Sequence, residues 1–200
     1  MCGNEAETTG GSTGDGWPVE LRGVTESVVA TRGPEGRWNF APLGLHDERP
    51  VRARTWGRTR TRHNFEERGE GYVQFTRNPV DFTEAALAIR EGDEPVLASA
   101  DAWARVDVGE LARGREDDTP WVDWALTPES AGVERETVPL LNRGNAAVIE
   151  ATVAASRLGV PTYDDDALRD RLEYFAGVIE QCGGEREQAA LVRLRELVDW

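Results

Sequence analysis

The amino-acid sequence predicts an α+β protein in which a closed or half-closed antiparallel β-barrel is followed by three helices. Two observations support this class. Up to residue 139, short segments rich in β-branched and aromatic residues alternate with turn residues, as in antiparallel sheets. Beyond residue 140, apolar residues recur every three to four positions, as in helices that bury one face. A chain of 200 residues suffices for one medium domain with a small appendage.

The barrel region divides into strands and two short helices. Thr61 is expected to cap a helix over 62–68 with Gly69 past its end, and Asn78 is a good cap for a helix that starts at Pro79. Six or more short strands with two intervening helices indicate the barrel. The segments expected as strands are 21–31, 38–45, 51–56, 71–76, 96–108, 121–127 and 132–138, with an acidic loop around 116–118.

The two ends of the chain differ in texture from the barrel region. Residues 1–16 hold almost no apolar side chains, so burial cannot offset the entropy of ordering them, and we expect a disordered tail. Helices are expected over 145–158, 166–181 and 185–200, punctuated by Pro161 and by Gly183 and Gly184. The predicted organisation is therefore a tail over 1–16, a barrel domain over 17–139 and a helical subdomain over 140–200.

The charge balance is strongly acidic. Asp and Glu number 37 against 23 basic residues, a net charge of −14, and every basic residue is Arg. Such a surface repels a phosphate backbone, so we expect no nucleic-acid partner. Two causes would give this composition: high-GC codon usage, and the hydrated acidic surface of a protein from a salty cytoplasm. We favour the two together over codon usage alone. The excess is greatest over 116–200, which holds 18 acids and 8 Arg.

Several chemistries are excluded by missing residues. Without any Lys, the chain has no phosphate-binding Walker lysine, no Schiff-base lysine and no lysine base. Two distant Cys and two His 17 positions apart cannot form a zinc ribbon or a zinc-protease helix, so no metal site is expected. Serine-hydrolase and dinucleotide-binding glycine motifs are also missing. No apolar run approaches the roughly 20 residues of a membrane span, and we expect a cytoplasmic protein without a membrane partner.

One segment departs from the acidic background. Six Arg and no acid occur between residues 49 and 62, interleaved with Thr and followed by His63 and Asn64. Guanidinium groups, hydroxyls, an amide and the N–H groups of a helix start suit a phosphate dianion. The alternative is a strand whose Arg side chains form ion pairs with the acidic surface. The six are Arg49, Arg52, Arg54, Arg58, Arg60 and Arg62.

The order of several short motifs resembles the FMN-binding split barrels of the flavin-reductase-like group. The motifs are Gly-Val-Thr-Glu-Ser-Val-Val-Ala-Thr over 23–31, Asn-Phe-Ala-Pro-Leu-Gly over 39–44, and Thr-x-Thr-x-x-Asn-Phe over 59–65 with the Gly-x-Gly-Tyr-Val that follows over 69–73. The similarity covers roughly 19–160. It is greatest to an uncharacterised archaeal branch, in our reading haloarchaeal, that has an extra helical C-terminal domain, whose helix start is similar to Arg-Gly-Asn-Ala over 143–146.

This resemblance implies a six-stranded split barrel that forms a homodimer with FMN near the interface. It places Asn39, Ala41 and Pro42 along the flavin ring, and Thr59, Thr61 and Asn64 at the phosphate with help from Arg58 or Arg60. Thr59 stands where flavin reductases typically have Ser. The resemblance supplies no acid, base or nucleophile, because the reactive atom belongs to the cofactor.

Three functions remain open from the sequence. The first is a flavin-dependent oxidoreductase that exchanges hydride or electrons with NAD(P)H or a small molecule. The second is a non-catalytic flavin carrier or sensor, and the third an interaction protein with an empty barrel. A deazaflavin or a pyridoxal-type ligand also suits this barrel class. His46 near the ring and His63 near the phosphate are expected to be ordinary loop and helix-surface residues.

Overall fold

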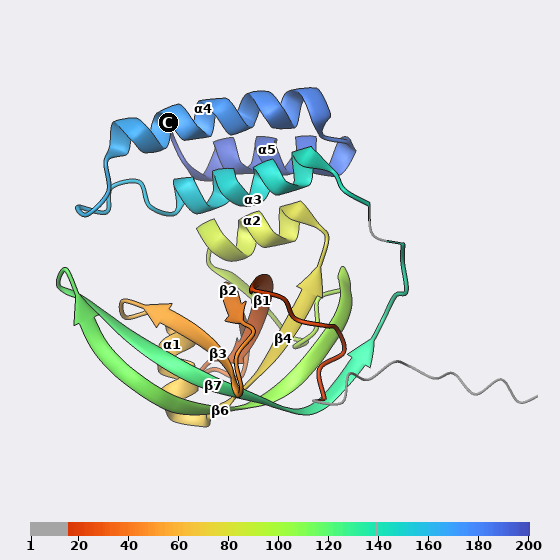
Figure 1. The fold of residues 1–200 in the computed structure, drawn as a ribbon, viewed down its shortest axis with the longest axis vertical. Helices are drawn as coiled ribbons and strands as arrows, with labels where there is room; N and C mark the ends of the chain where they lie inside the picture. Colours follow the sequence, from red (N-terminus) through yellow and green to blue (C-terminus); the bar gives the residue numbers. More distant parts are fainter. Residues whose placement is uncertain (1–15, 139) are drawn as a thin grey trace, which may run out of the picture.

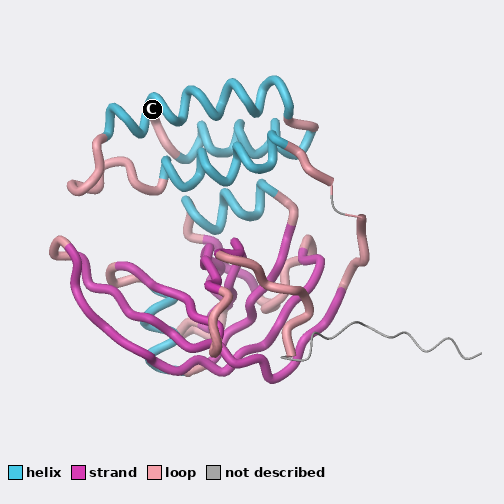
Figure 2. Tube along the Cα trace, in the orientation of Figure 1, coloured by secondary structure: helices cyan, strands magenta, loops and turns pink. Residues whose placement is uncertain are grey.

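The computed structural model describes residues 16–138 and 140–200. Figure 1 shows two parts, a curved β-barrel below and a layer of helices above it. Figure 2 shows the same division by secondary structure, with only α1 among the strands. The predicted tail over 1–16 lies outside the described residues except for Gly16. The elements are β1 (Val24–Arg32), β2 (Trp38–His46), β3 (Val51–Trp56), α1 (Arg60–Arg68), β4 (Glu70–Thr76), α2 (Pro79–Leu87), β5 (Arg90–Gly92), β6 (Ala100–Glu116), β7 (Thr119–Val133), α3 (Arg143–Ala155), α4 (Asp165–Cys182) and α5 (Glu185–Leu197).

The expected strands are present, with corrections at their ends. Strand β1 begins at Val24 rather than at residue 21, and β6 covers Ala100–Glu116 rather than 96–108. Strand β7 covers the expected segment 121–127 but ends at Val133, so residues 134–138 lie outside it; it pairs with β6 through register shifts. The acidic loop is the tight turn of this hairpin, where Asp117 and Asp118 adopt positive φ. Helix α1 begins two residues before the predicted start, and its N-cap is Thr59, whose side chain accepts from the N–H of Arg62. Thr61, the cap expected from the sequence, is instead the second residue of the helix, because the residue that caps a helix precedes its first turn.

Six antiparallel strands close the barrel in the order β1, β4, β6, β7, β3 and β2, with β2 pairing back onto β1. The seam between β2 and β3 is short, since only Leu45–Ala53 and His46–Arg52 are paired. The first half of β2 pairs instead with the added strand β5, through Trp38 to Phe40. The predicted split barrel is thus confirmed, and the split lies between β2 and β3.

Residues at alternate positions fill the barrel interior. Leu43 and Leu45 of β2 lie inside with Val29 of β1, and α1 closes one end with Phe65, which is 2% exposed. Phe65 packs edge-on against Trp124 of β7, with ring centroids 5.4 Å apart. This alternation follows from the two-residue period of a strand, and it leaves the next residues, at even positions in β2, on the outer face.

The outer face of β1 and β2 is also apolar because α2 covers it. Val28, Ala30 and Phe40 pack against Phe82 and Ala85 of α2. The apolar content of these two strands is therefore accounted for within the chain, because α2 buries this face.

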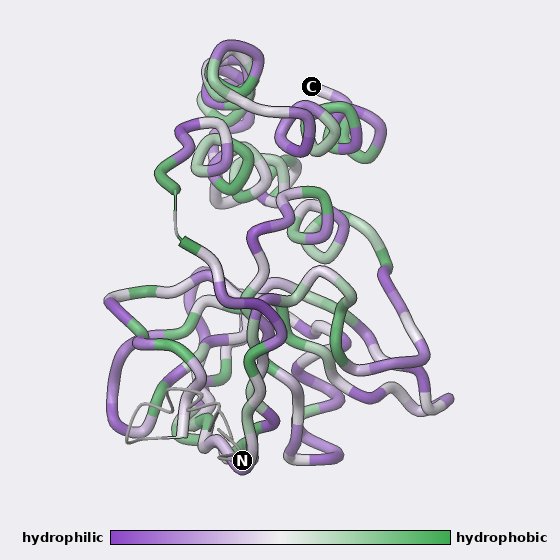
Figure 3. The backbone as a smooth tube through the Cα atoms, turned by 90° about the vertical axis from the view of Figure 1, so that its right-hand side faces the viewer, coloured by the Kyte–Doolittle hydropathy of each residue, from purple (hydrophilic) through white to green (hydrophobic). Residues whose placement is uncertain are grey.

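Helices α3, α4 and α5 form the upper layer around a third core, which contains Leu172, Ile179 and Leu194. In Figure 3, turned by 90°, these helices lie over α2, and each changes from apolar to polar around its circumference. Gly144 in the first turn of α3 is required by a close approach: an added Cβ would lie 2.5 Å from the Cα of Gly183. This contact explains the glycine of the Arg-Gly-Asn-Ala motif; Gly183 itself is required because an added Cβ would lie 2.6 Å from the Ile179 carbonyl oxygen.

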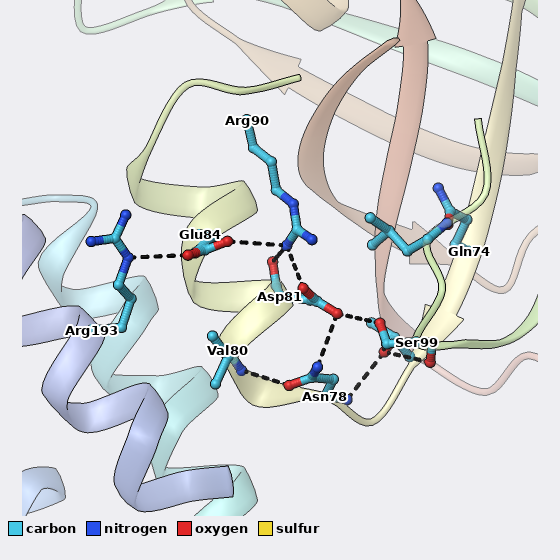
Figure 4. Close-up of polar contacts among 10 residues, drawn as sticks. Gln74, Asn78, Val80, Asp81, Glu84, Arg90, Ser99 and Arg193 are labelled. Atoms are coloured by element: carbon cyan, nitrogen blue, oxygen red, sulfur yellow. Dashed lines mark hydrogen bonds and ion pairs between the residues drawn. The ribbon is translucent and has the colours of Figure 1, made fainter. Parts of the chain in front are cut away.

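Polar contacts fix α2 between the two layers (Figure 4). Arg90 donates to Asp81 at 2.6 Å and lies 3.4 Å from Glu84, both on α2. Glu84 also accepts a hydrogen bond of 3.1 Å from the Nε of Arg193 on α5. Asp81 accepts from Asn78 at 3.0 Å and from the Ser99 hydroxyl. The barrel, α2 and the helical layer are therefore joined through two carboxylates.

Candidate functional site

A cleft of about 920 Å³ separates the outer faces of β1, β2 and β3 from α2, α3 and the segment after α3. Its floor is formed by the outward positions of the strands, among them Glu26 of β1, Pro42 and Gly44 of β2, and Trp56 of β3. Its roof includes Arg157 and other residues that follow α3. A volume at the upper end of the usual 300–1,000 Å³ for ligand sites makes this cleft the candidate functional site.

Strands β1 and β2 pair along the floor. Glu26 lies opposite Gly44, and Val24 lies opposite His46. An added Cβ on Gly44 would stand 3.3 Å from Val24, so glycine leaves room above the strand. The Glu26 side chain is accessible from the cleft, but partial burial raises its pKa, and the facing carboxylate of Glu150 on α3 raises it further. Paired strands with no side chain at position 44 leave a surface on which a planar ring can lie.

The Arg side chains of β3 are neutralised by carboxylates. Arg54 forms hydrogen bonds of 2.6 and 2.8 Å with Asp123 of β7, and Arg52 contacts both Asp123 and Glu48. Asp123 has a lowered pKa because it accepts from Arg54 and lies near two guanidinium groups. Arg54 is also stacked at 4.1 Å from the Trp121 ring centroid and 5.3 Å from that of Trp56. For these two residues the ion-pair alternative is correct.

The rest of the Arg cluster lies around the start of α1. Arg60 is 2.6 Å from Glu91, and Arg62 is 3.1 Å from Glu66. Arg58 is exposed and has no carboxylate partner among residues 16–138 and 140–200. Arg49, which precedes β3, is also exposed and also has no carboxylate partner among these residues. Arg58 thus provides a free guanidinium beside a helix N-terminus.

The start of α1 adjoins the end of the cleft. Trp56 and Gly57 line the cleft, and Gly57 has a φ of 71°, which turns the chain toward the helix that begins three residues later. The Thr59 side chain accepts a hydrogen bond from the N–H of Arg62, and the Thr59 carbonyl accepts one from the N–H of His63. The N–H groups of Arg60 and Thr61 have no acceptor within the helix. Anions bind at such ends.

The eight residues predicted from sequence occupy four environments. Arg58, Thr59 and Arg60 are exposed at the helix start, and Pro42 lines the cleft floor. Thr61 and Asn64 are each 4% exposed, on the face of α1 that packs on the barrel. Asn39 and Ala41 are on the inward-facing side of β2, where Asn39 is 7% exposed and Ala41 is half-buried.

A set of hydrogen bonds and strand pairs joins the buried residues. Asn64 donates to the Thr31 hydroxyl at 2.9 Å, and Thr31 is the register partner of Asn39. Asn39 in turn lies opposite Glu91 of β5, which binds Arg60. The structure therefore brings Asn39, Thr31 and the start of α1 together at one level of the sheet, with Pro42 farther along β2 toward the cleft.

The two His residues lie apart. His46 is half-buried on the cleft floor, whereas His63 is exposed on α1 with its Nε2 3.6 Å from a Glu67 oxygen. Over the part of the chain that the structure describes, no three His, Cys, Asp or Glu side chains are grouped as metal ligands. Within the same residues, no helix has the length and apolarity to cross a membrane.

Sequence reasoning did not identify the cleft or its roof. Glu26, Arg157 and Tyr163 line the cleft, but 130 or more positions separate Glu26 from the other two. Strand alternation predicts that Glu26 faces outward. It does not predict that Arg157 and Tyr163 lie across the cleft, because helix packing over a sheet has no local sequence signature.

The barrel, its short β2–β3 seam and the capping helix α1 define an α+β split barrel of the flavin-reductase-like type, extended by three C-terminal helices. The chain belongs to the family described as "Protein of unknown function (DUF447)". The model of the family's N-terminal domain matches residues 25–135, and a second model of the family matches 142–196.

One solved structure shows the same fold over most of the chain, and two others are similar to part of it. An FMN-bound protein from Methanosarcina mazei, which carries the same family model, is 22% identical over 89% of this chain and 96% of its own, with a TM-score of 0.76. The flavin reductase of the styrene monooxygenase from Pseudomonas putida S12 is 14% identical over 58% of this chain and 93% of its own, with a TM-score of 0.41. Flavoredoxin from Methanosarcina acetivorans is 11% identical over 58% and 72%, with a TM-score of 0.40. No curated protein matches the chain.

Proposed function

We propose that this protein binds FMN in the cleft, with the phosphate at the start of α1 and the ring along the floor formed by β2. The observation that carries the proposal is the continuity of the two sites: the floor runs from Pro42 to Gly57, and α1 begins three residues later. A surface of paired strands at one end and an anion site at the other fit a planar ring joined to a phosphate. The FMN-bound relative with the same fold supports this choice of ligand.

The donors present fit a phosphate monoester. Arg58 and Arg60, the Thr59 hydroxyl and the first N–H groups of α1 would hold it. Thr61 and Asn64 would act from behind, by fixing the helix on the barrel, and Asn39 and Ala41 would support the strand under the ring. Bound FMN supplies hydride or electron transfer at its own ring; the chain's residues bind and orient it and exclude water.

A matched pair of variants tests the phosphate site. Arg58→Ala is expected to weaken FMN binding about ten- to a hundredfold, the effect of losing a charge-assisted hydrogen bond. Riboflavin, which lacks the phosphate, should bind equally well to both proteins. Arg49→Ala is the control, because Arg49 is equally exposed and unpaired but lies outside the cleft lining. The measurement is flavin titration by fluorescence quenching. Equal losses for FMN and riboflavin would contradict the assignment.

We further propose that the protein is an oxidoreductase rather than a carrier or sensor. The cleft has a second wall, formed after α3, that the proposed FMN site does not use, so a reaction partner has access to the ring. The test is anaerobic reduction of the FMN-loaded protein with NADH or NADPH, followed by absorbance. Bleaching faster than for free FMN supports an enzyme, and unchanged absorbance with both reductants supports a carrier or sensor. Mass spectrometry of the released chromophore distinguishes FMN from a deazaflavin or a pyridoxal-type ligand.

We also propose a homodimer, as the resemblance implies. The described barrel strands keep exposed apolar side chains on their outer surface, such as Leu111 and Val133 at 50% and 44% exposure. Light scattering should give twice the chain mass of 22.1 kDa. A chain that is monomeric while it binds FMN would exclude an interface site.

A further inference from the structure

The roof of the cleft carries a cation that the fold leaves free. Three Arg residues line the cleft, and the two on the floor, Arg52 and Arg54, are bound to carboxylates. The third, Arg157, has no carboxylate partner within the described ranges 16–138 and 140–200. Its guanidinium lies 5.1 Å from the ring centroid of Tyr163, and the residue is half-buried. A guanidinium stacked on a ring keeps its N–H edges available for an acceptor.

The segment that carries Arg157 has a defined shape. The carbonyl of Arg157 accepts from the Val160 N–H at 3.1 Å, and the carbonyl of Val160 accepts from the Tyr163 N–H at 3.0 Å. The nearest acids in sequence have other partners: Glu150 pairs with Arg171, Asp164 caps α4, and Asp165 accepts from the Gly159 N–H at 2.9 Å. Arg157 is therefore positioned in the cleft but not neutralised by its own segment.

Two aromatic side chains in the cleft are accessible. Trp56 on the floor and Tyr163 on the roof are each 45% exposed, although large apolar side chains are usually covered. Exposed rings on both walls favour a planar ligand, which can stack on them. Apolar side chains between them, Pro42, Phe82 and Val160, extend this surface.

The other charges in the cleft limit the ligand further. Glu26 lies on the floor, and Glu116 and Asp117 reach the cleft from the β6–β7 turn. For a ligand bound at Arg157, these acids disfavour further anionic groups, whereas one carboxylate directed at Arg157 is compatible with them. A cleft with one free cation and three acids discriminates by net charge.

We propose that Arg157 and Tyr163 form a second ligand subsite, opposite the flavin floor, that binds an aromatic monocarboxylate. The subsite itself rests on the roof geometry alone; its role as the site of the flavin's reaction partner rests on the proposed function. Arg157 binds the carboxylate, and Tyr163 and Trp56 contact the ring.

The test uses benzoate as probe and benzamide as its neutral analogue. Benzoate should bind the FMN-loaded protein and change the flavin absorbance, and calorimetry should detect it in the FMN-free protein as well. Arg157→Gln should weaken benzoate binding about ten- to a hundredfold and leave benzamide unchanged. Arg169→Gln is the control, because Arg169 is an exposed Arg on α4 outside the cleft lining. Thermal melting of each variant establishes that it is folded.

The outcomes separate the two proposals. Loss of benzoate binding in Arg157→Gln alone supports the subsite, even if the protein binds no FMN, in which case only the proposed function fails. Benzoate affinity that is absent in the folded wild type, unchanged by Arg157→Gln, or matched by benzamide overturns the subsite. FMN binding that persists in those cases leaves the proposed function intact.

Discussion

Arg54 and Asp123 lie directly opposite each other in the β3–β7 ladder and form a two-pronged ion pair, with distances of 2.6 Å from Nε to Oδ1 and 2.8 Å from Nη2 to Oδ2. The Asp123 side chain is 11% exposed, and that of Arg54 is 28% exposed. The pair stands between Trp56 on the cleft floor and Trp121, and it neutralises the strand beneath the cleft.

This pair gives a prediction for acid stability. The pKa of Asp123 is below its ordinary value of 3.8 in the folded protein, because Arg54 and Arg52 stabilise its charge. A carboxyl with a lowered folded pKa stabilises the fold above its unfolded pKa, and the contribution is lost as the pH falls through the folded value. Asp123→Asn should lower the free energy of unfolding by about 1–3 kcal/mol at pH 7. Denaturation across pH 2–7 should show the difference shrinking below about pH 4; a constant difference would contradict it.

The contact between Gly144 and Gly183 gives a prediction for packing. Gly144→Ala places a methyl group 2.5 Å from the Gly183 backbone, which cannot move without displacing the α4–α5 junction. The cost should be about 1–3 kcal/mol. Gly177→Ala on α4 is the control, since nothing lies within 4 Å of its added Cβ. That change should be neutral or stabilise by up to about 1 kcal/mol. Urea denaturation measures both, and equal effects would be inconsistent with the close approach.

Asn64 and Thr59 are expected to affect flavin binding differently. Asn64→Ala removes the buried bond to Thr31, should destabilise by about 1 kcal/mol, and should weaken FMN and riboflavin alike. Thr59→Ala removes the helix cap at a cost of about 1 kcal/mol, and it should weaken FMN more than riboflavin. Titrations with both flavins measure the ratio of affinities. A loss confined to FMN in Asn64→Ala would place that amide at the phosphate itself.

The charge distribution predicts a dependence on salt. Residues 116–200 hold 18 acids and 8 Arg, and α4 begins with three consecutive Asp residues at 164–166. At about 0.01 M ionic strength the screening length grows to about 30 Å, so repulsion extends across the helical layer. Helix content by circular dichroism and the melting temperature should both fall in dilute buffer and recover in concentrated salt. Identical curves in the two buffers would rule this out.

Local signals in the sequence predicted the elements. Strand alternation, the Asn78–Pro79 helix start and Gly69 after α1 all appear at the expected places, because each is a property of a few adjacent residues. The sequence predicted two strands, 121–127 and 132–138, where β7 is one strand from Thr119 to Val133, because the strand continues past Pro128 through register shifts against β6. Such irregular pairing depends on the partner strand, which local patterns do not encode.

The sequence by itself determined the fold class, the net negative charge and the local excess of Arg and Thr at the start of α1, because composition, periodicity and capping are local. Only the tertiary structure decided how the Arg cluster divides. Arg52 and Arg54 are neutralised by Asp123, about 70 positions away, whereas Arg58 is left free. The cleft also arises only from tertiary structure, because its floor at Glu26 and its roof at Arg157 and Tyr163 meet through packing of α2 and α3 over the barrel. Long-range packing depends on the whole set of buried surfaces, and no single segment specifies it.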